Sequence, residues 1–150
     1  MKFIITVLLF LSCFTFASIA QKNNGRQLYE AIHAKDTLQV EMLLNKGADA
    51  NYKEKWMKFE MSMLILAVQN KDFKSVKLLI EHKAQIDWKD IAQITALMYA
   101  AYIGDVNIIN YLIKSGADIH AHDDQGNTVL SAAKEGKHPE AIQVIEAALK

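Results

Sequence analysis

The sequence is poor in cysteine and carries no excess of charge of either sign. Its one cysteine, Cys13, lies in an apolar N-terminal stretch, so the chain after residue 20 can form neither a disulfide nor a thiolate metal site. The 17 Lys and Arg residues are balanced by 17 Asp and Glu residues, which gives a formal net charge of zero. This balance argues against a nucleic-acid-binding surface, which needs a basic patch.

Motifs typical of enzymes are also absent from the sequence. There is no Gly-x-Ser-x-Gly nucleophile turn, no phosphate-binding glycine loop and no His-Glu-x-x-His metal motif. The carboxylates are scattered over turns and outer helix surfaces, where a solvated side chain is the usual explanation. We therefore predict that the protein is not an enzyme and that it has neither catalytic residues nor a cofactor.

The longest apolar run is the N-terminal segment over residues 1–20. It begins with a lysine near the N-terminus and ends in Ser18-Ile19-Ala20, small residues typical of a secretory cleavage site. Its apolar core is shorter than the roughly 20 residues that span a bilayer, which disfavours an uncleaved anchor. The residues before Cys13 are a poor match to a lipoprotein signal. We predict a signal peptide over residues 1–20, a flexible lead-in over 21–25 and one domain over 26–150.

The centre of the chain, residues 95–118, is typical of two short helices followed by a stop. Apolar residues at i, i+3 and i+4 spacing over 97–101 predict one helix, and those over 109–113 predict a second. Gly116 follows, at the position past a helix end where a left-handed backbone is common. Helices below about 12–15 residues are marginal alone in water, so such a unit needs neighbours.

Copies of this unit recur along the chain. An alanine marks the same position of the first helix in each copy, and successive alanines are 36, 33 and 33 residues apart: Ala31, Ala67, Ala100 and Ala133. A leucine stands three residues before each of these alanines, and a valine or isoleucine nine residues after it. The first spacing is three residues longer than the others, which places an insertion in the loop over residues 52–61.

A 33-residue period of paired helices resembles the ankyrin repeat. The family's Thr-Pro-Leu-His-x-Ala motif corresponds to residues 95–100 and 128–133, and residues 123–128 match its Asp-x-x-Gly-x-Thr hairpin. The resemblance implies an all-α fold, an ankyrin-repeat α-solenoid of four helix-turn-helix repeats joined by hairpin-like loops. The predicted repeats span about residues 26–58, 62–94, 95–127 and 128–150.

The chain departs from the family pattern at several positions. No copy carries the proline or the histidine of the motif. Lys83 stands where glycine closes other repeats, and a left-handed conformation costs a non-glycine residue about 1 kcal/mol. Either Lys83 adopts that conformation at this cost, or its helix ends in another way.

The resemblance also implies that a partner docks on the concave side, which first helices and hairpin loops line. Aromatic side chains dominate many interfaces, so we expect at least two of those on this side to face solvent. The alternative is that Trp56 and Phe59 fold back over the core. The candidate partner-binding residues are Tyr52, Trp56, Phe59, Trp88, Lys89, Ile91, Tyr102, Ile103, His122, Asp124 and Gln125.

A histidine pair is the alternative candidate for a ligand site. His120 and His122 are two residues apart in a loop, with Asp123 or Asp124 as the nearest further ligands, but a metal site needs at least three or four. His120 also occupies the repeat position of Asn51, where a polar residue is expected to tie down the loop. Methionine thioethers can bind copper(I), and the candidates are Met57, Met61 and Met63. Met61 and Met63 flank a helix start, so we assign them to packing. We predict no metal.

These observations predict an exported, monomeric protein-binding module that contacts neither nucleic acid nor, after signal cleavage, the membrane. The absence of cysteine after residue 20 and of any Asn-x-Ser/Thr acceptor favours the bacterial periplasm, with secretion as the alternative. The resemblance to small exported bacterial ankyrin proteins implies an adaptor, a supporter of a periplasmic enzyme, or an immunity protein that blocks a toxin. A metal carrier is the weakest hypothesis.

Overall fold

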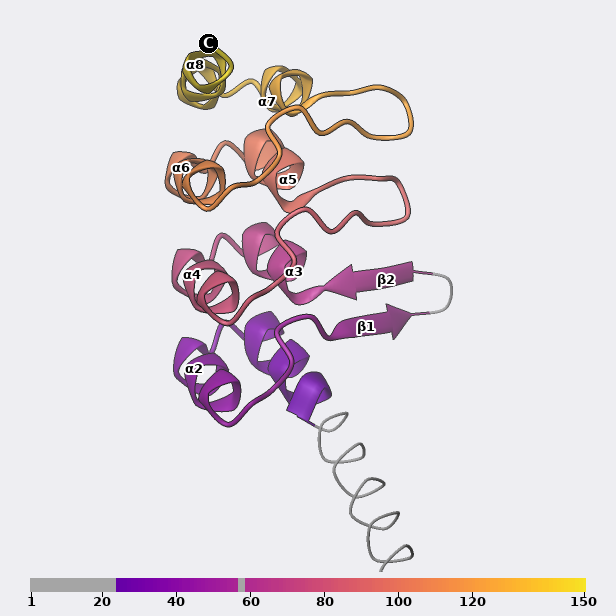
Figure 1. Ribbon diagram of the computed structural model, residues 1–150, viewed down its shortest axis with the longest axis vertical. Coiled ribbons are helices and arrows are strands. Elements are labelled where there is room, and N and C mark those ends of the chain that lie inside the picture. The colour runs from indigo at the N-terminus through magenta and orange to yellow at the C-terminus, as the bar shows by residue number, and fades with distance from the viewer. Residues whose placement is uncertain (1–23, 57–58) are drawn as a thin grey trace, which may run out of the picture.

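The computed structural model describes residues 24–56 and 59–150. A first helix covers residues 24–33. It is followed by α2 Thr37–Asn45, β1 Lys53–Trp56, β2 Phe59–Ser62, α3 Met63–Gln69, α4 Phe73–Glu81, α5 Ala96–Ile103, α6 Val106–Lys114, α7 Val129–Gly136 and α8 Pro139–Ala148 (Figure 1). The predicted signal peptide lies outside the described residues. None of the helices within them is long and apolar enough to cross a membrane.

The helices stack in pairs and form a solenoid. Figure 1 shows three columns: the second helices of each pair, then the first helices, then the β-hairpin and two loops. Each pair contacts the next pair through its first helices, its second helices or both. The prediction of an all-α solenoid of four helix-turn-helix repeats joined by hairpin-like loops is confirmed.

Side-chain caps explain where most of these helices begin. In each cap a side-chain oxygen accepts a hydrogen bond from the backbone N–H three residues later, which satisfies one of the free donors of the first turn. The caps are Asp36, Asp72 and Asp105 for α2, α4 and α6, and Ser62, Thr95 and Thr128 for α3, α5 and α7. Helix α8 instead begins with Pro139, whose fixed φ suits a first helical position. The helix starts are therefore encoded locally, repeat by repeat.

The turns after the second helices show which backbone conformation Lys83 adopts at the end of its helix. Gly47 and Gly116 have φ of 85° and 93°, and Lys83 has a φ of 68°. Lys83 thus adopts the same left-handed conformation as the glycines, and α4 ends in the same way as α2 and α6. Its backbone carries the strain of about 1 kcal/mol expected for a residue with a Cβ.

The first helix includes Asn24 and Gly25, two residues of the predicted flexible lead-in. Gly25 is buried, and a Cβ on it would overlap the ring of Tyr52. The contact comes from a residue beyond α2, so the composition of residues 21–25 could not indicate it.

The core lies between the two helix columns and runs the length of the solenoid. The alanines that mark the repeat are at most 5% exposed, and their small side chains let first helices approach their neighbours: Ala31, Ala67, Ala100 and Ala133. Leu64, Leu97 and Ile109 are also buried. The unit over residues 95–118 is covered by a repeat on each side, as the register predicts.

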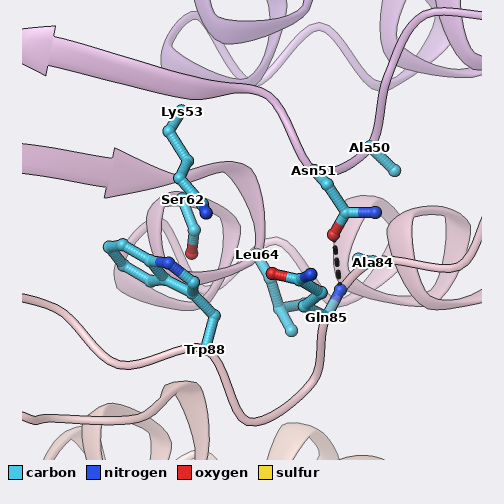
Figure 2. Close-up of a pocket in the computed structure, with 8 residues that line it drawn as sticks. All are labelled: Ala50, Asn51, Lys53, Ser62, Leu64, Ala84, Gln85 and Trp88. Atoms are coloured by element: carbon cyan, nitrogen blue, oxygen red, sulfur yellow. Dashed lines mark hydrogen bonds between the residues drawn. The ribbon is translucent and has the colours of Figure 1, made fainter.

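Polar side chains connect the loops of successive repeats. The Asn51 side chain donates to the backbone oxygen of Lys83 (3.0 Å) and accepts from the backbone N–H of Gln85 (2.7 Å), a contact shown in Figure 2. One repeat later, Asp87 accepts from the N–H of Asp118 at 2.8 Å. Asn51 therefore ties down the loop, as predicted for its position.

Candidate functional site

The first loop forms a β-hairpin that stands beside the first helices. Strands β1 and β2 pair antiparallel, with Lys53 opposite Ser62 and Trp56 opposite Phe59. Alternate side chains of a strand point to opposite faces, so Lys53 and Lys55 share one face and Glu54 lies on the other. The three-residue insertion thus lengthens this loop into a pair of strands, whereas the two later loops carry only an isolated bridge, His122 with Thr128.

An open groove of about 830 Å³ lies between the hairpin and the helix over residues 24–33. Its lining residues are Arg26, Tyr29, His33, Glu54, Lys55, Phe59, Glu60, Met61 and Leu66. Phe59 is 61% exposed, so a large apolar ring stands on the wall of the groove in contact with solvent. Such an exposed apolar surface marks a candidate interaction site.

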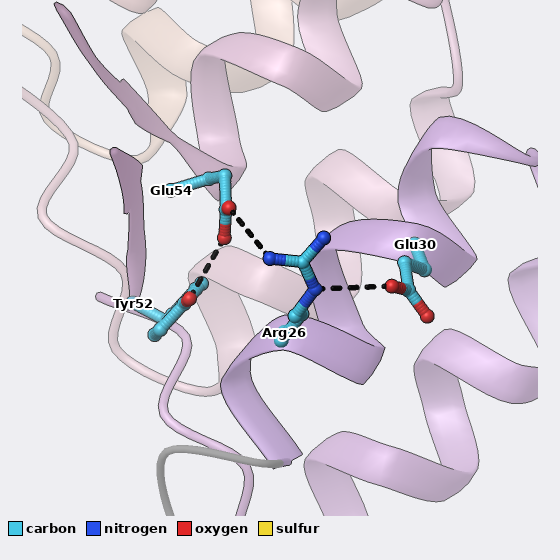
Figure 3. Close-up of polar contacts among 4 residues, drawn as sticks. All are labelled: Arg26, Glu30, Tyr52 and Glu54. Carbon is cyan, nitrogen blue, oxygen red and sulfur yellow. Dashed lines mark hydrogen bonds and ion pairs between the residues drawn. The ribbon is translucent and has the colours of Figure 1, made fainter. Parts of the chain in front are cut away.

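The charged groups of the groove are paired with one another. Arg26 lies 3.3 Å from carboxylate oxygens of both Glu30 and Glu54, and the Tyr52 hydroxyl donates to Glu54 at 2.7 Å (Figure 3). Burial, followed by the Glu54 carboxylate, raises the pKa of Tyr52 above its usual value, so the phenol stays a donor. Across the hairpin, Lys55 and Glu60 form an ion pair at 2.8 Å. The hydrogen bond from Lys55 lowers the pKa of Glu60.

Trp88 supports the hairpin from the second loop. Its ring is half-buried, and the Lys53 ammonium lies 5.4 Å from the ring centroid, within the range of a cation–π interaction. The cavity beneath the ring, drawn in Figure 2, holds only about 10 Å³. That space is about enough for one water molecule. Trp88 therefore joins the hairpin to the next loop and lines no ligand-sized cavity there.

A second, smaller pocket of about 230 Å³ lies between α5, α7 and the third loop. It is lined by Ile94, Met98, Tyr99, Tyr102, Asp123, Asn127, Ala132 and Glu135. The Tyr99 hydroxyl donates to Asp90 at 2.8 Å. Burial, then this hydrogen bond and the Asp90 charge, raise the pKa of Tyr99 to about 12, so its phenol is neutral at physiological pH. Tyr102 is 51% exposed at the edge of the pocket.

Asp123 organises the third loop and remains ionised. Its carboxylate accepts from the backbone N–H groups of Gln125 (2.9 Å) and Asn127 (2.8 Å) and from the Asn127 side chain (2.9 Å). The Asn127 side-chain bond is the main cause of its lowered pKa. Gly126 has a φ of 82°, which explains the glycine of the hairpin motif.

Other predicted residues join neighbouring loops. Lys89 donates from its ammonium to the backbone oxygen of His122 at 3.0 Å, and the Asp124 N–H donates to Ala92 at 3.3 Å. Ile91 is 59% exposed.

Gln125 is exposed, and Ile103 is half-buried against the core. The fold thus gathers Phe59 at the large groove and Tyr102 at the small pocket, two aromatics facing solvent as expected. The side chain of Trp56 lies outside the described residues.

Apart from Tyr102 on α5, the residues that line the two cavities from the helices were not predicted from the sequence. Arg26, Tyr29 and His33 follow one another at successive helical turns, and this i, i+3, i+7 spacing places them on one face of the helix. Tyr99 and Glu135 similarly face the small pocket from α5 and α7.

The candidate metal ligands are distributed as follows. Met63 is fully buried and Met61 is half-buried, which fits packing, while Met57 lies outside the described residues. His122 Nδ1 lies 3.2 Å from the backbone oxygen of Asp123. Within residues 24–56 and 59–150, no three His, Cys, Asp or Glu side chains are grouped so that they could hold a metal ion.

Comparison with known proteins identifies the repeat. The family described as ankyrin repeats (3 copies) matches residues 28–123. Similar proteins include an ankyrin repeat protein of Fowlpox virus (strain NVSL), 35% identical over 97 residues, which are 64% of this chain and 22% of that protein. The ankyrin repeat and KH domain-containing protein mask-1 of Caenorhabditis elegans is 31% identical over 121 residues, 79% of this chain and 4% of that protein.

A bacterial relative, an ankyrin repeat protein of Borreliella burgdorferi (strain ATCC 35210 / DSM 4680 / CIP 102532 / B31), is 26% identical over 103 residues, 69% of this chain and 45% of the relative. The chain therefore spans less than half the length of each of these relatives. Ankyrin repeats generally mediate protein–protein interaction and are typically non-catalytic. By the match to the family over most of its described residues, together with its stacked helix pairs, the chain belongs to the ankyrin repeat family.

Proposed function

We propose that this chain is a non-catalytic, monomeric protein-binding module of the periplasm that holds a protein partner on its concave face. The observation that carries the proposal is the groove of about 830 Å³ beside the hairpin, with Phe59 61% exposed on its wall. Its size suits a segment of a protein chain better than a single side chain.

The charge arrangement of the groove supports the same function. Burying an unpaired charge is costly, and a partner that closes this groove would cover groups already paired, Arg26 with Glu54 and Lys55 with Glu60. Tyr29, Phe59 and Met61 supply apolar surface between these pairs. A partner on the groove would therefore leave none of these paired charges buried alone, which is the most costly case.

Export is proposed from the predicted signal peptide over residues 1–20. The test is expression of the full chain with a C-terminal tag in a bacterium, followed by cell fractionation and N-terminal sequencing. We expect periplasmic protein that begins at Gln21. Cytoplasmic protein that begins at Met1 would contradict the proposal, and release into the medium would favour secretion.

The binding surface is tested with a photo-crosslinking amino acid placed at position 59 or, as a control, at position 38. Leu38 is 70% exposed on α2, which lies in the column away from the hairpin. We expect a specific crosslinked protein from position 59 only.

The purified partner should then bind the Tyr29→Ala/Phe59→Ala variant at least tenfold more weakly, while Leu38→Ala binds normally and both keep their helical circular dichroism. Equal crosslinking from the two positions would contradict the concave-face proposal. A single partner bound at nanomolar affinity or tighter would favour an immunity protein, and several weak partners an adaptor.

A further inference from the structure

The small pocket between α5 and α7 is the part of the concave face where negative charge is not paired. All five ion pairs of the described residues lie between Arg26 and Glu81. Asp123 and Glu135 line the pocket, and Asp90 lies behind its Tyr99 wall. No cation of the described residues comes within ion-pair distance of these three carboxylates.

The two carboxylates at the pocket differ in their freedom. Asp123 already accepts three hydrogen bonds from its own loop and acts as a fixed negative charge. Glu135 is exposed and makes no ion pair or side-chain hydrogen bond with the described residues. It lies in the last turn of α7, where the helix dipole favours a cation and not an anion. A positive group at this position would therefore be favoured by both the side chain and the helix.

Among the described residues, Lys89 reaches the third loop, but its ammonium is directed away from the carboxylates of the pocket. The Lys89 ammonium donates to the backbone oxygen of His122. It is thus held by a neutral carbonyl, and none of the ion pairs among the described residues joins it to Asp123.

The walls of the pocket suit a flat cation. Tyr102 is half-exposed at its edge, and Tyr99, Met98 and Ile94 form apolar or aromatic surface inside. At about 230 Å³ the pocket is smaller than the roughly 300–1,000 Å³ typical of small-molecule sites. It has room for one side chain of a larger partner.

We propose that this pocket receives an arginine side chain of the protein partner, an inference that rests on the proposed protein-binding function. The guanidinium stacks on the ring of Tyr102 and donates to the Glu135 carboxylate, while Asp123 contributes long-range attraction. A planar guanidinium matches a carboxylate and an aromatic face better than the ammonium of lysine does.

In this arrangement the groove and the small pocket contribute differently to partner binding. The groove at Phe59 supplies apolar contact, and the pocket at Glu135 selects partners that carry a basic residue near their apolar anchor. Charge complementarity of this kind contributes to specificity and to the rate of association.

The test is an NMR titration of the isotope-labelled full chain with N-acetylarginine amide, with N-acetylcitrulline amide as the uncharged match. We expect saturable shifts of the amide signals around Tyr102, Asn127 and Glu135 with the arginine probe only. Glu135→Gln should weaken this binding about two- to fivefold, the range of an exposed ion pair. Tyr102→Ala should weaken it by a similar factor.

The matched control is Glu146→Gln, which removes one exposed carboxylate from α8 outside the pocket. It should leave the arginine affinity unchanged. Equal shifts with citrulline, no saturable shift at the pocket, or unchanged affinity in Glu135→Gln would each overturn the inference.

Failure of this inference is distinguishable from failure of the proposed function. Loss of partner binding in Tyr29→Ala/Phe59→Ala without arginine binding at the pocket would leave the concave-face function intact and remove the arginine site. Arginine binding at the pocket without any crosslinked partner from position 59 would leave the arginine site intact and remove the proposed concave-face function.

Discussion

The large groove and the small pocket occupy equivalent places in the first and third repeats, yet they differ in size and charge. Each lies between two successive first helices and the loop that joins their repeats. In register, His33 corresponds to Tyr102, and Leu66 to Ala132. The volumes are about 830 and 230 Å³. One repeat framework therefore carries two different surfaces.

The three-residue insertion explains much of this difference. The longer loop forms paired strands, and β1 brings Glu54 to within 3.3 Å of Arg26 on the first helix. The third loop lacks the insertion and is held by its own Asp123, which leaves Glu135 on α7 without a partner from the loop. The longer loop thus supplies a carboxylate that pairs with the first helix, whereas the carboxylate of the third loop bonds within its own loop.

The largest predicted effect tests whether the repeats that carry the groove and those that carry the small pocket share one hydrophobic core. Leu64→Ala and Leu97→Ala delete equivalent buried side chains, and each should lower the free energy of unfolding by about 2–5 kcal/mol. Urea denaturation followed by circular dichroism should show one transition for both variants. Two separate transitions, or losses that differ several-fold, would show that these repeats also differ in their cores.

A smaller effect is predicted for two glycines of first helices. A Cβ at Gly136 would overlap the backbone oxygen of Tyr102, whereas a Cβ at Gly25 would meet the ring of Tyr52. Gly136→Ala should therefore cost about 1–3 kcal/mol by overpacking. Gly25→Ala should cost less because a side chain can move aside more easily than a backbone. Thermal unfolding of both variants checks the order, and the reverse order would contradict this account.

The ion pairs of the groove should contribute little to stability. Arg26→Ala removes the contacts to Glu30 and Glu54, and the exposed position of Arg26 limits the loss to about 0.2–1 kcal/mol. The loss should shrink at high salt, which screens exposed charges. Lys77→Ala, which breaks an ion pair with Glu81 outside the groove, is the control. A salt-independent loss above this range would mean that Arg26 has a packing role.

The last predicted effect is a loss of stability at alkaline pH. The pKa of Tyr99 is raised from 10.0 to about 12 in the folded protein, so its contribution is fully present below pH 10 and is lost as the pH rises towards 12. Tyr99→Phe should show a shallower decline in unfolding free energy over this range than the native chain. Ultraviolet absorbance should also show one fewer late-ionising tyrosine in this variant. An equal decline would contradict the prediction.

Much of the fold could be predicted because each repeat contains the local sequence signals that specify its helices. The apolar spacing places the helices, and Thr95 and Thr128 start them. The residues that line the groove and the small pocket could be predicted only in part. Phe59 and Tyr102 were placed on it from their repeat positions, but Arg26, Tyr29 and Glu135 were not.

The sequence by itself determined the number and order of the helices, because the apolar spacing within each helix depends on residues a few positions apart. It also located the insertion in the first loop. Only the tertiary structure decided that Arg26 meets Glu54, 28 residues away, and that Glu135 faces Tyr102 across a pocket. Such pairings depend on how one repeat stacks on the next, and local spacing carries no information about that geometry.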